Sequence, residues 1–303
     1  METAAAGSAP RVLTALVSPF DERGHLDLAT AGALARRLCA RGSDGFVLAG
    51  TTGESPTLGA QEKLALCAAV RSAVDGQAQV WLGTGGNDTA ASCELTAAAA
   101  AAGAQGVMAV VPYYSRPPQQ GLLAHFQAIA RSTPLPVMVY NIPARTGCNL
   151  LPQTLGALKA ACPNLWAIKE ASRDLEQVGE ICRLLPEFVV YSGDDALTLP
   201  VLALGGRGVV SVASHLVPER IALLVASALR GEWELARRTH LGLLPLYRAL
   251  FLTTNPIPVK VALRQAGFPV GGFRRPLCEP TEAEAAQIRA VVREHGLDGS
   301  LRV

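Results

Sequence analysis

The amino-acid sequence alternates short, almost continuously apolar runs with longer segments in which apolar positions recur at helical spacing. The apolar runs have the length of strands and cover residues 12–19, 45–50, 80–84, 106–112, 136–141, 165–170, 188–192 and 208–213. Helical periodicity is clear in residues 27–40, 61–70, 94–102, 122–131 and 175–184. Strands that are apolar at nearly every position are typical of a parallel sheet covered by helices on both faces. The pattern therefore predicts an α/β fold.

The number of these units favours a barrel. Eight β/α units over roughly 220 residues are the usual content of a (β/α)8 barrel. A doubly wound sheet is the competing architecture, but no G-x-G-x-x-G turn follows the first apolar run. After residue 216 the strand-like runs stop, and helical segments follow at 218–228, 232–252, 256–265 and 281–295. We therefore expect a flexible N-terminal tail (1–10), a (β/α)8 TIM barrel (11–229) and a C-terminal helical region (230–303).

The composition is that of an enzyme-sized globular chain. Of its 303 residues 50% are hydrophobic, and the net charge of +2 is not gathered into a run of one sign. Nucleic acids and membranes are therefore not expected partners. The seven cysteines show no C-x-x-C spacing, which argues against a disulfide framework and a thiolate zinc site. The uncharged stretch 95–115 is interrupted by Gly103 and Pro112, and residues 1–10 resemble no secretory signal, so a cytoplasmic location is expected.

Lys169 lies inside the apolar run 165–170, where a lysine has few structural explanations. Removal of an ammonium group from water disfavours its charged form and can lower a lysine pKa by about 3–5 units. A neutral amine attacks carbonyl carbons and forms Schiff bases, so Lys169 is a candidate covalent catalyst. The alternative is a lysine at an exposed strand end whose ammonium group reaches solvent.

Other candidate residues follow the apolar runs, and the active sites of (β/α)8 barrels lie at the C-terminal ends of their strands. Residues 50–55 can present N–H groups and hydroxyls to a small carboxylate, although a tight turn explains the same residues. The fourth and fifth runs lead to tyrosines in 112–117 and 140–147. Tyrosine is most often a core residue, but a phenol near an attacking amine can move protons without adding a charge. The pair Asp194-Asp195 is more simply a helix cap than a catalytic pair of carboxylates.

Six motifs together resemble one enzyme family. They are GTTGES (50–55), PYYSRP (112–117), YNIPARTG (140–147), IKEAS (168–172), SGDDA (192–196) and NPIPVK (255–260). From about residue 12 to residue 295 the chain is similar to the dihydrodipicolinate synthases, or 4-hydroxy-tetrahydrodipicolinate synthases, of the N-acetylneuraminate lyase superfamily of class I aldolases. The resemblance implies a lyase that condenses pyruvate with L-aspartate 4-semialdehyde to give 4-hydroxy-tetrahydrodipicolinate, in lysine and diaminopimelate biosynthesis.

The resemblance implies four catalytic residues. Lys169 is expected to form a Schiff base with pyruvate, and Tyr140 to shuttle protons. Thr51 and Tyr114 are expected to complete the proton relay, with Tyr114 reaching into the site of a neighbouring subunit. The family therefore implies a homo-oligomer, a dimer of dimers, and a covalent mechanism that requires no metal or organic cofactor. The sequence offers no competing metal site, because its five histidines show no ligand spacing.

Four further residues match substrate-binding positions of the family. Thr52 is expected to hold the carboxylate of pyruvate, and Gly193 and Val210 to line the pyruvate site through their backbones. Arg145 is expected to receive the carboxylate of L-aspartate 4-semialdehyde, a role that suits a planar guanidinium. Relatives that cleave sialic acid lack this arginine, so it favours the synthase. The alternatives are another pyruvate-dependent aldolase or lyase, acting on sialic acid or a keto-deoxy sugar acid, and a catalytically silent barrel with a binding role.

The resemblance also implies a feedback site for L-lysine between subunits. The matching residues are Ser55, Pro56, Ala60, Lys63, Asn87, Ala91 and Tyr113. Lysine-sensitive relatives often carry histidines at the positions of Ala60 and Lys63 and a glutamate at that of Ala91. An alanine accepts no hydrogen bond and Lys63 adds a like charge, so weak or absent inhibition by lysine is expected.

Overall fold

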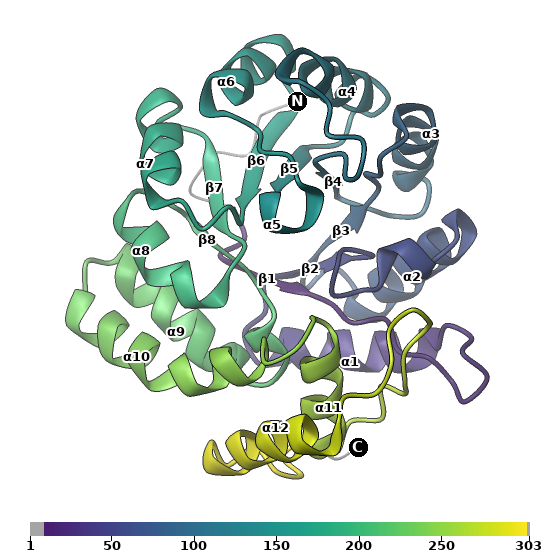
Figure 1. The fold of residues 1–303 in the computed structure, drawn as a ribbon, viewed down its shortest axis with the longest axis vertical. Coiled ribbons are helices and arrows are strands. Elements are labelled where there is room, and N and C mark those ends of the chain that lie inside the picture. Colours follow the sequence, from purple (N-terminus) through teal and green to yellow (C-terminus); the bar gives the residue numbers. More distant parts are fainter. Residues whose placement is uncertain (1–8, 302–303) are drawn as a thin grey trace.

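The computed structural model describes residues 9–301. At its centre eight parallel strands follow one another in chain order around a closed barrel (Figure 1). They are β1 (Val12–Ala15), β2 (Gly45–Leu48), β3 (Gln79–Gly83), β4 (Gly106–Val110), β5 (Val137–Asn141), β6 (Leu165–Glu170), β7 (Val189–Ser192) and β8 (Gly208–Ser211). The predicted TIM barrel is confirmed. Of the tail expected over residues 1–10, the first eight lie outside the described residues, while Pro10 is buried and accepts a hydrogen bond of 2.6 Å from the Tyr191 hydroxyl.

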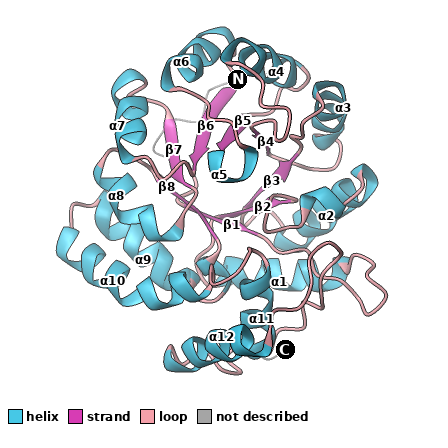
Figure 2. Ribbon diagram, viewed as in Figure 1, coloured by secondary structure: helices cyan, strands magenta, loops and turns pink. Residues whose placement is uncertain are grey.

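Helices surround the barrel on its outside (Figure 2). They are α1 (Leu28–Ala40), α2 (Ala60–Val74), α3 (Thr89–Ala99), α4 (Gln119–Arg131), α6 (Pro152–Ala161), α7 (Leu175–Leu184), α8 (Thr198–Ala203) and α9 (Pro218–Leu229). The short helix α5 (Pro143–Thr146) instead lies over the middle of the barrel in Figure 1. Helices α1, α3 and α7 are capped at their N-termini by Asp27, Asp88 and Asp174. Each aspartate accepts a hydrogen bond from a backbone N–H group of the first turn.

The strands are apolar at almost every position because both of their faces are buried. Side chains that face the helices, such as those of Phe46 and Ile168, join one large outer cluster. Side chains that face the barrel axis form an inner cluster, which includes Trp81 and Tyr191. Gly106 lies against this cluster, and a Cβ there would stand 2.4 Å from the Trp81 ring, so only glycine leaves room. The barrel interior is therefore filled, and space for a ligand has to come from its end.

The C-terminal helices are joined closely to the barrel. Helix α10 (Trp233–Ala249) packs on α9, while α11 (Ile257–Gln265) packs on α12 (Glu282–Glu294) and on the turn after β8. The connection between α11 and α12 passes over the loop after β1, where the Phe20 N–H donates to the carbonyl of Val270 at 3.2 Å. The predicted C-terminal helical region is thus present, and part of it lies at the C-terminal ends of the first strands.

Some strand ends differ from the ends of the apolar runs. Strand β1 ends at Ala15, although its apolar run continues to residue 19. The chain leaves the sheet there, and the Val17 N–H donates to Nε2 of His215 at 3.2 Å instead of to a strand. Apolar character therefore reports burial, and it does not show where ladder pairing stops.

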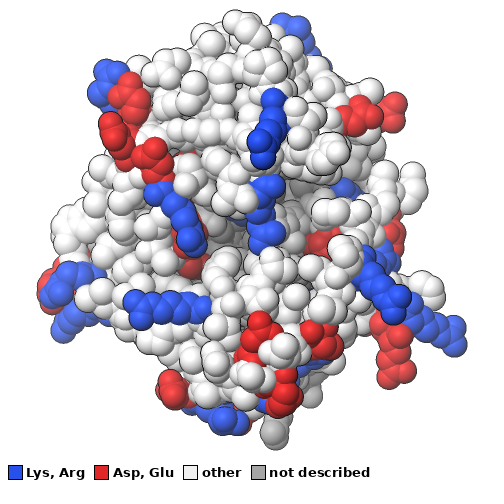
Figure 3. Space-filling view, viewed as in Figure 1, with Lys and Arg blue, Asp and Glu red and all other residues white. Residues whose placement is uncertain are grey.

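The surface carries scattered charge of both signs. On the face drawn in Figure 3, acidic and basic side chains are interspersed, and basic side chains lie beside a central hollow. Within residues 9–301, no helix combines the length and apolar character needed to cross a membrane.

Candidate active site

Lys169 lies near the C-terminal end of β6 and packs against the neighbouring strand. It is paired in the sheet with Tyr140 of β5, and its Nζ atom stands 4.1 Å from the centroid of the Tyr140 ring. Only 5% of Lys169 is exposed. Burial lowers its pKa to about 7, the carboxylate of Asp195 acts in the opposite direction, and the guanidinium of Arg145 adds to the lowering. The alternative of a lysine that reaches solvent is therefore excluded.

Tyr140 and Tyr191 are both paired with Lys169 in the sheet, but the Tyr191 hydroxyl donates to the carbonyl of Pro10, and Tyr140, 4% exposed, is the one whose ring the amine contacts. Burial raises the pKa of Tyr140, while a hydrogen bond with Thr51 and the charge of Arg145 lower it. The phenol is therefore neutral near pH 7 and can donate a proton. The structure thus places Tyr140 in contact with both Lys169 and Thr51.

A cavity of about 630 Å³ opens at the C-terminal ends of the strands beside these residues. Thr51, Tyr140 and Arg145 line it, together with Met108 and Asn255. The volume lies in the usual range for sites that bind small molecules. Lys169 does not itself line this cavity, so a small carbonyl compound in it reaches the candidate nucleophile by way of Tyr140, whose ring the amine contacts.

Arg145 and Thr52 are linked through Asn255, which precedes α11. Asn255 donates from Nδ2 to Thr52 Oγ1 at 2.9 Å, and its backbone carbonyl accepts from Nη2 of Arg145 at 3.4 Å. Thr52 is 2% exposed, whereas Arg145 is exposed on α5. Because the Thr52 oxygen accepts this hydrogen bond, its own proton is available to an anion. The sequence motif contained Asn255 but gave it no role, because its partners lie more than a hundred residues away.

Gly193 lies directly after β7 and close to Lys169, whereas Val210 lies in the neighbouring strand β8. A Cβ at Gly193 would stand 2.7 Å from the Ala171 side chain and 3.1 Å from Cγ of Lys169, so this position requires glycine. The Gly193 N–H donates to the carbonyl of Glu170 at 2.7 Å. Val210, which is 1% exposed, belongs to the inner cluster that also contains Ala171. Gly193 thus packs against the candidate nucleophile, and Val210 forms part of the filled interior of the barrel.

Tyr114 is separate from the other candidate residues. Its side chain is 91% exposed, and it does not line the cavity, whereas its neighbour Tyr113 does. Its backbone has a φ of +73°, a conformation that L side chains rarely adopt. The structure of the single chain therefore does not bring Tyr114 to Lys169, and its exposure leaves it available to another subunit.

The two aspartates after β7 have different environments. Asp194 caps the short helix η3 (Asp195–Leu197) by accepting from the Ala196 N–H, as predicted. Asp195 is 2% exposed and accepts a hydrogen bond of 2.5 Å from the Ser211 hydroxyl. Its charge also acts on Lys169. The interpretation of this pair as a helix cap missed the effect of the Asp195 charge on Lys169. The only signal for that effect in the sequence was the position of Asp195 just after a strand.

The cavity extends beyond the candidate catalytic residues. All seven residues of the expected lysine site line it: Ser55, Pro56, Ala60, Lys63, Asn87, Ala91 and Tyr113. Burial lowers the pKa of Lys63. The candidate active site and this second region are therefore continuous.

Comparison with known proteins identifies close relatives. The model of the Dihydrodipicolinate synthetase family matches residues 8–295. The chain is 50% identical over 291 residues to the 4-hydroxy-tetrahydrodipicolinate synthase of Heliobacterium modesticaldum, which covers 96% of this chain and 97% of that protein. It is 53% identical over 285 residues to the protein of the same name from Desulforudis audaxviator, with 94% and 97% covered.

Solved structures give the same relationship. The dihydrodipicolinate synthase of Aquifex aeolicus superimposes with a TM-score of 0.94 at 38% identity, covering 96% of this chain and 99% of that one. The enzyme of Cyanidioschyzon merolae, solved with lysine bound, gives 0.93 at 48% identity, with 95% and 98% covered. A structure described as the first monomeric dihydrodipicolinate synthase variant gives 0.93 at 38% identity, with 96% and 98% covered. On this likeness over almost its whole length, the chain belongs to the dihydrodipicolinate synthetase family.

Proposed function

We propose that this chain condenses pyruvate with L-aspartate 4-semialdehyde to give 4-hydroxy-tetrahydrodipicolinate, the product for which its relatives are named. The packing of the Lys169 amine against Tyr140, with a pKa of about 7, is the observation that carries the proposal. At that pKa a large fraction of the amine is neutral at physiological pH and can attack a keto carbon. An ordinary surface lysine would remain protonated.

The first half of the reaction forms the Schiff base. The neutral amine of Lys169 attacks the keto carbon of pyruvate, and a C–N bond forms while the carbonyl oxygen becomes a hydroxyl. Tyr140, hydrogen-bonded to Thr51, gives a proton to this hydroxyl, which leaves as water. The Tyr140 phenolate left by this step then takes a methyl proton, which converts the iminium into an enamine and restores the phenol for the second half. Because the iminium itself accepts the electron pair, this chemistry needs no metal or organic cofactor.

The second half forms the carbon–carbon bond. The enamine carbon attacks the aldehyde carbon of the semialdehyde, and the aldehyde oxygen takes a proton from the Tyr140 relay. The amino group of the semialdehyde then adds to the imine carbon, and the bond to Lys169 breaks. Ring closure therefore returns the free amine for the next turnover.

Separate groups hold the two substrates in this proposal. Thr52 donates its hydroxyl proton to the carboxylate of pyruvate, and the backbones of Gly193 and Val210 line the same site. Arg145 binds the carboxylate of the semialdehyde, because a guanidinium offers two parallel donors to a carboxylate. The bridge through Asn255 supports this division, since it keeps Thr52 and Arg145 at neighbouring positions.

The proton relay is completed across a subunit interface. We assign Tyr114 to the site of a neighbouring copy, in a homo-oligomer built as a dimer of dimers. Two facts support this assignment: the side chain is 91% exposed, and its backbone is held at a φ of +73°. A strained backbone that presents an exposed aromatic side chain is more readily explained by a contact than by solvent.

Borohydride trapping with pyruvate tests the proposed chemistry. The wild-type chain should gain one pyruvate-derived adduct, and mass mapping should place it on Lys169. Lys169→Ala should give no adduct and should lose several orders of magnitude in turnover. The same protein should consume L-aspartate 4-semialdehyde in the presence of pyruvate and should not cleave sialic acid. An adduct on another lysine, or cleavage of sialic acid, would overturn the assignment.

A further inference from the structure

The loop that carries Thr51 and Thr52 has an unusual backbone. It runs from the end of β2 to the start of α2, and two of its non-glycine residues lie in the left-handed region, Ala49 at a φ of +50° and Glu54 at +54°. Such conformations persist only where surrounding contacts hold them in place. Gly53 adds to the tight packing, because a Cβ there would stand 2.9 Å from the backbone nitrogen of Ala49. The loop needs external support.

A buried ion pair supplies part of this support. Lys260 of α11 donates from Nζ to Oε1 of Glu54 at 2.7 Å, and the two side chains are 0% and 1% exposed. The same ammonium group donates to the carbonyl of Gly272 at 2.6 Å and lies 4.4 Å from the centroid of the Phe20 ring. The other carboxylate oxygen of Glu54 accepts from the backbone N–H of Arg274 at 3.1 Å. Glu54 is therefore held by two separate parts of the C-terminal region.

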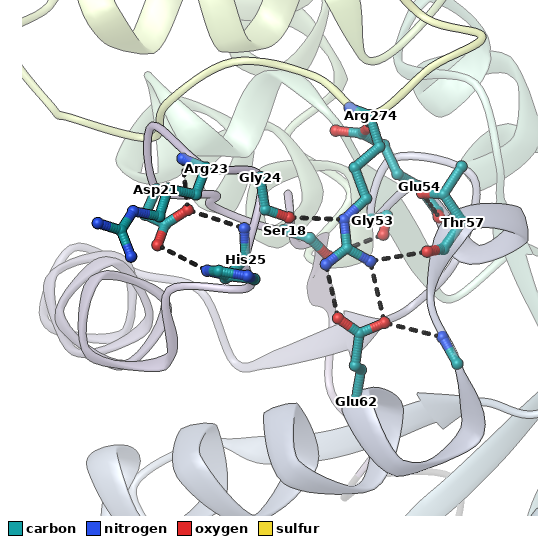
Figure 4. A network of polar contacts seen from close by, with 11 residues as sticks. Ser18, Asp21, Arg23, Gly24, His25, Gly53, Glu54, Thr57, Glu62 and Arg274 are labelled. Atoms are coloured by element: carbon teal, nitrogen blue, oxygen red, sulfur yellow. Dashed lines mark hydrogen bonds and ion pairs between the residues drawn. The ribbon is translucent and has the colours of Figure 1, made fainter.

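Arg274 fixes the far end of the same loop (Figure 4). Its Nη1 atom donates to the carbonyl of Thr57 at 2.7 Å, and its two terminal nitrogens bind the carboxylate of Glu62 at 2.9 and 2.6 Å. Glu62 in turn accepts from the Gly59 N–H at the start of α2, at 2.9 Å. Nε of Arg274 donates to the carbonyl of Gly24, in the loop after β1. The guanidinium thus joins three segments that are distant in sequence.

Stability alone does not explain a pair of this kind. Replacement of a buried ion pair by apolar side chains of similar volume is often neutral or stabilising, because both ions lose their hydration. The anchor on the C-terminal side is firm, since Val259, Ala262 and Leu263 of α11 are all 0% exposed. The loop has few buried apolar side chains of its own, so it is the loop that moves if the pair is removed.

We infer that Glu54, Lys260 and Arg274 are positioning residues, which hold the loop 50–57 so that the hydroxyls of Thr51 and Thr52 meet pyruvate. The inference rests on the proposed function. It gives the C-terminal region a part in binding the first substrate, although neither Lys260 nor Arg274 lines the cavity. Glu54 lines the cavity as part of the loop, whereas Lys260 and Arg274 act only through the loop.

The test separates positioning from stability by removing both charges together. Lys260→Met leaves the Glu54 carboxylate buried without a counterion and should destabilise the fold strongly, whereas Glu54→Gln with Lys260→Met should recover most of the melting temperature. The recovered double variant should still need about tenfold more pyruvate for half-saturation of borohydride trapping. Its KM for the semialdehyde should be unchanged, because Arg145 lies on α5 and contacts the carbonyl of Asn255, on the C-terminal side that stays anchored, and not the loop. A purely structural pair predicts recovery of pyruvate binding along with stability.

Two further variants complete the experiment. Arg264→Met is the matched control, because Arg264 lies on the same helix and pairs with Glu279 at the partly exposed surface. It should leave half-saturation by pyruvate unchanged. Arg274→Lys keeps the charge but loses the paired contacts to Glu62, and it decides the question if the double variant does not fold. It should also raise the pyruvate requirement.

The outcomes distinguish this inference from the proposed function. The positioning role is overturned if the double variant reaches half-saturation of trapping at the same pyruvate concentration as the wild type. If the double variant is unfolded, Arg274→Lys decides in the same way. Either result leaves the proposed reaction intact. A wild-type chain that forms no pyruvate adduct overturns the proposed reaction and the inference together.

Discussion

Lys169 makes pH a direct probe of the proposed chemistry. Its ammonium form cannot attack a ketone, and burial lowers its pKa to about 7. At pyruvate concentrations well below saturation, imine formation should fall about tenfold for each pH unit below this value and become level above it. Adduct formation trapped with cyanoborohydride and measured by mass spectrometry across the neutral range tests this expectation. A rate that keeps rising toward 10.5, the ordinary pKa of lysine, would contradict it.

The same lysine should lower the stability of the fold. Its pKa is about 7 in the folded chain against 10.5 for an ordinary lysine, so between these values the unfolded state binds more protons and stability rises with pH. Below pH 7 the destabilisation of the fold by the buried ammonium group of Lys169 is fully present. Lys169→Met should therefore raise the free energy of unfolding at pH 7 by at least about 1.4 kcal/mol, the equivalent of one pKa unit. The gain should shrink as the pH approaches 10.5.

Urea denaturation of the wild type and of Lys169→Met at neutral and alkaline pH measures this difference. The variant should also fail to form the pyruvate adduct, so greater stability and loss of chemistry should appear together. A variant that is less stable than the wild type at neutral pH would show that the ammonium group is better solvated in the folded chain than its 5% exposure indicates.

Arg145 separates the two substrates. Arg145→Ala should leave the pyruvate adduct intact and raise the KM for the semialdehyde by roughly ten- to a hundredfold, the effect of losing one charge-assisted hydrogen bond. Because its charge also lowers the pKa of Lys169, the midpoint of the pH profile for trapping should move upward in this variant. Steady-state kinetics and the trapping profile of the same preparation test both effects. Loss of pyruvate trapping with unchanged use of the semialdehyde would show that Arg145 does not bind the second substrate as proposed.

At the scale of elements, the sequence predicted the strands and main helices well because burial leaves a local pattern. Continuous apolar runs identified all eight strands, and helical spacing identified α1, α2, α3, α4 and α7. Sheet pairing then brings Tyr140 next to Lys169, since each stands near the C-terminal end of its strand. Residues that act from consecutive strand ends are therefore within reach of sequence reasoning.

Contacts between distant segments were not predictable in the same way. Asn255 meets Thr52, and Lys260 meets Glu54, across more than 200 residues in each case. Neither contact leaves a periodic signal, because each depends on how the C-terminal helices pack on the finished barrel. Asp195 was assigned only a capping role for a similar reason: its hydrogen bond to Ser211 connects two strand ends. The motifs marked these positions without showing what they touch.

The outer part of the cavity bears on regulation of the whole molecule. A relative that is 48% identical, from Cyanidioschyzon merolae, was solved with lysine bound. In this chain the region that the sequence resemblance implies for L-lysine presents Ala60, Lys63 and Ala91 to the cavity, so it offers no acceptor at these positions and places a positive charge beside an entering cation. Half-maximal inhibition by L-lysine should therefore require more than about a millimolar concentration.

Initial rates across a lysine titration measure this sensitivity. The double variant Lys63→His with Ala91→Glu is the matched gain-of-function control, because it restores an acceptor and a negative charge in the same cavity. It should be inhibited at lower lysine concentrations than the wild type, by roughly tenfold or more. Inhibition of the wild type below about a millimolar would show that other contacts suffice for binding.

Assembly is expected to complete the active site, because Tyr114 does not reach the cavity of its own chain. Tyr114 is 91% exposed, so a subunit can offer this side chain to a partner. The same subunit then lacks a Tyr114 phenol in its own active site. Sedimentation should show an oligomer, although a monomeric variant of the family has been described, so association alone is not a sufficient test. Subunit complementation asks whether the residue acts across the interface.

Two impaired variants are mixed for this purpose after reversible dissociation. Tyr114→Phe keeps its own Lys169 but gives its partner no phenol, whereas Lys169→Ala has no nucleophile but still provides Tyr114. In a mixed pair, one site receives both intact groups, so random pairing should restore about a quarter of the sites. Mixing Tyr114→Phe with itself controls for refolding. If the mixture regains no activity while Lys169→Ala subunits remain associated with their partners, Tyr114 does not act across the interface, and the relay must be completed within one chain.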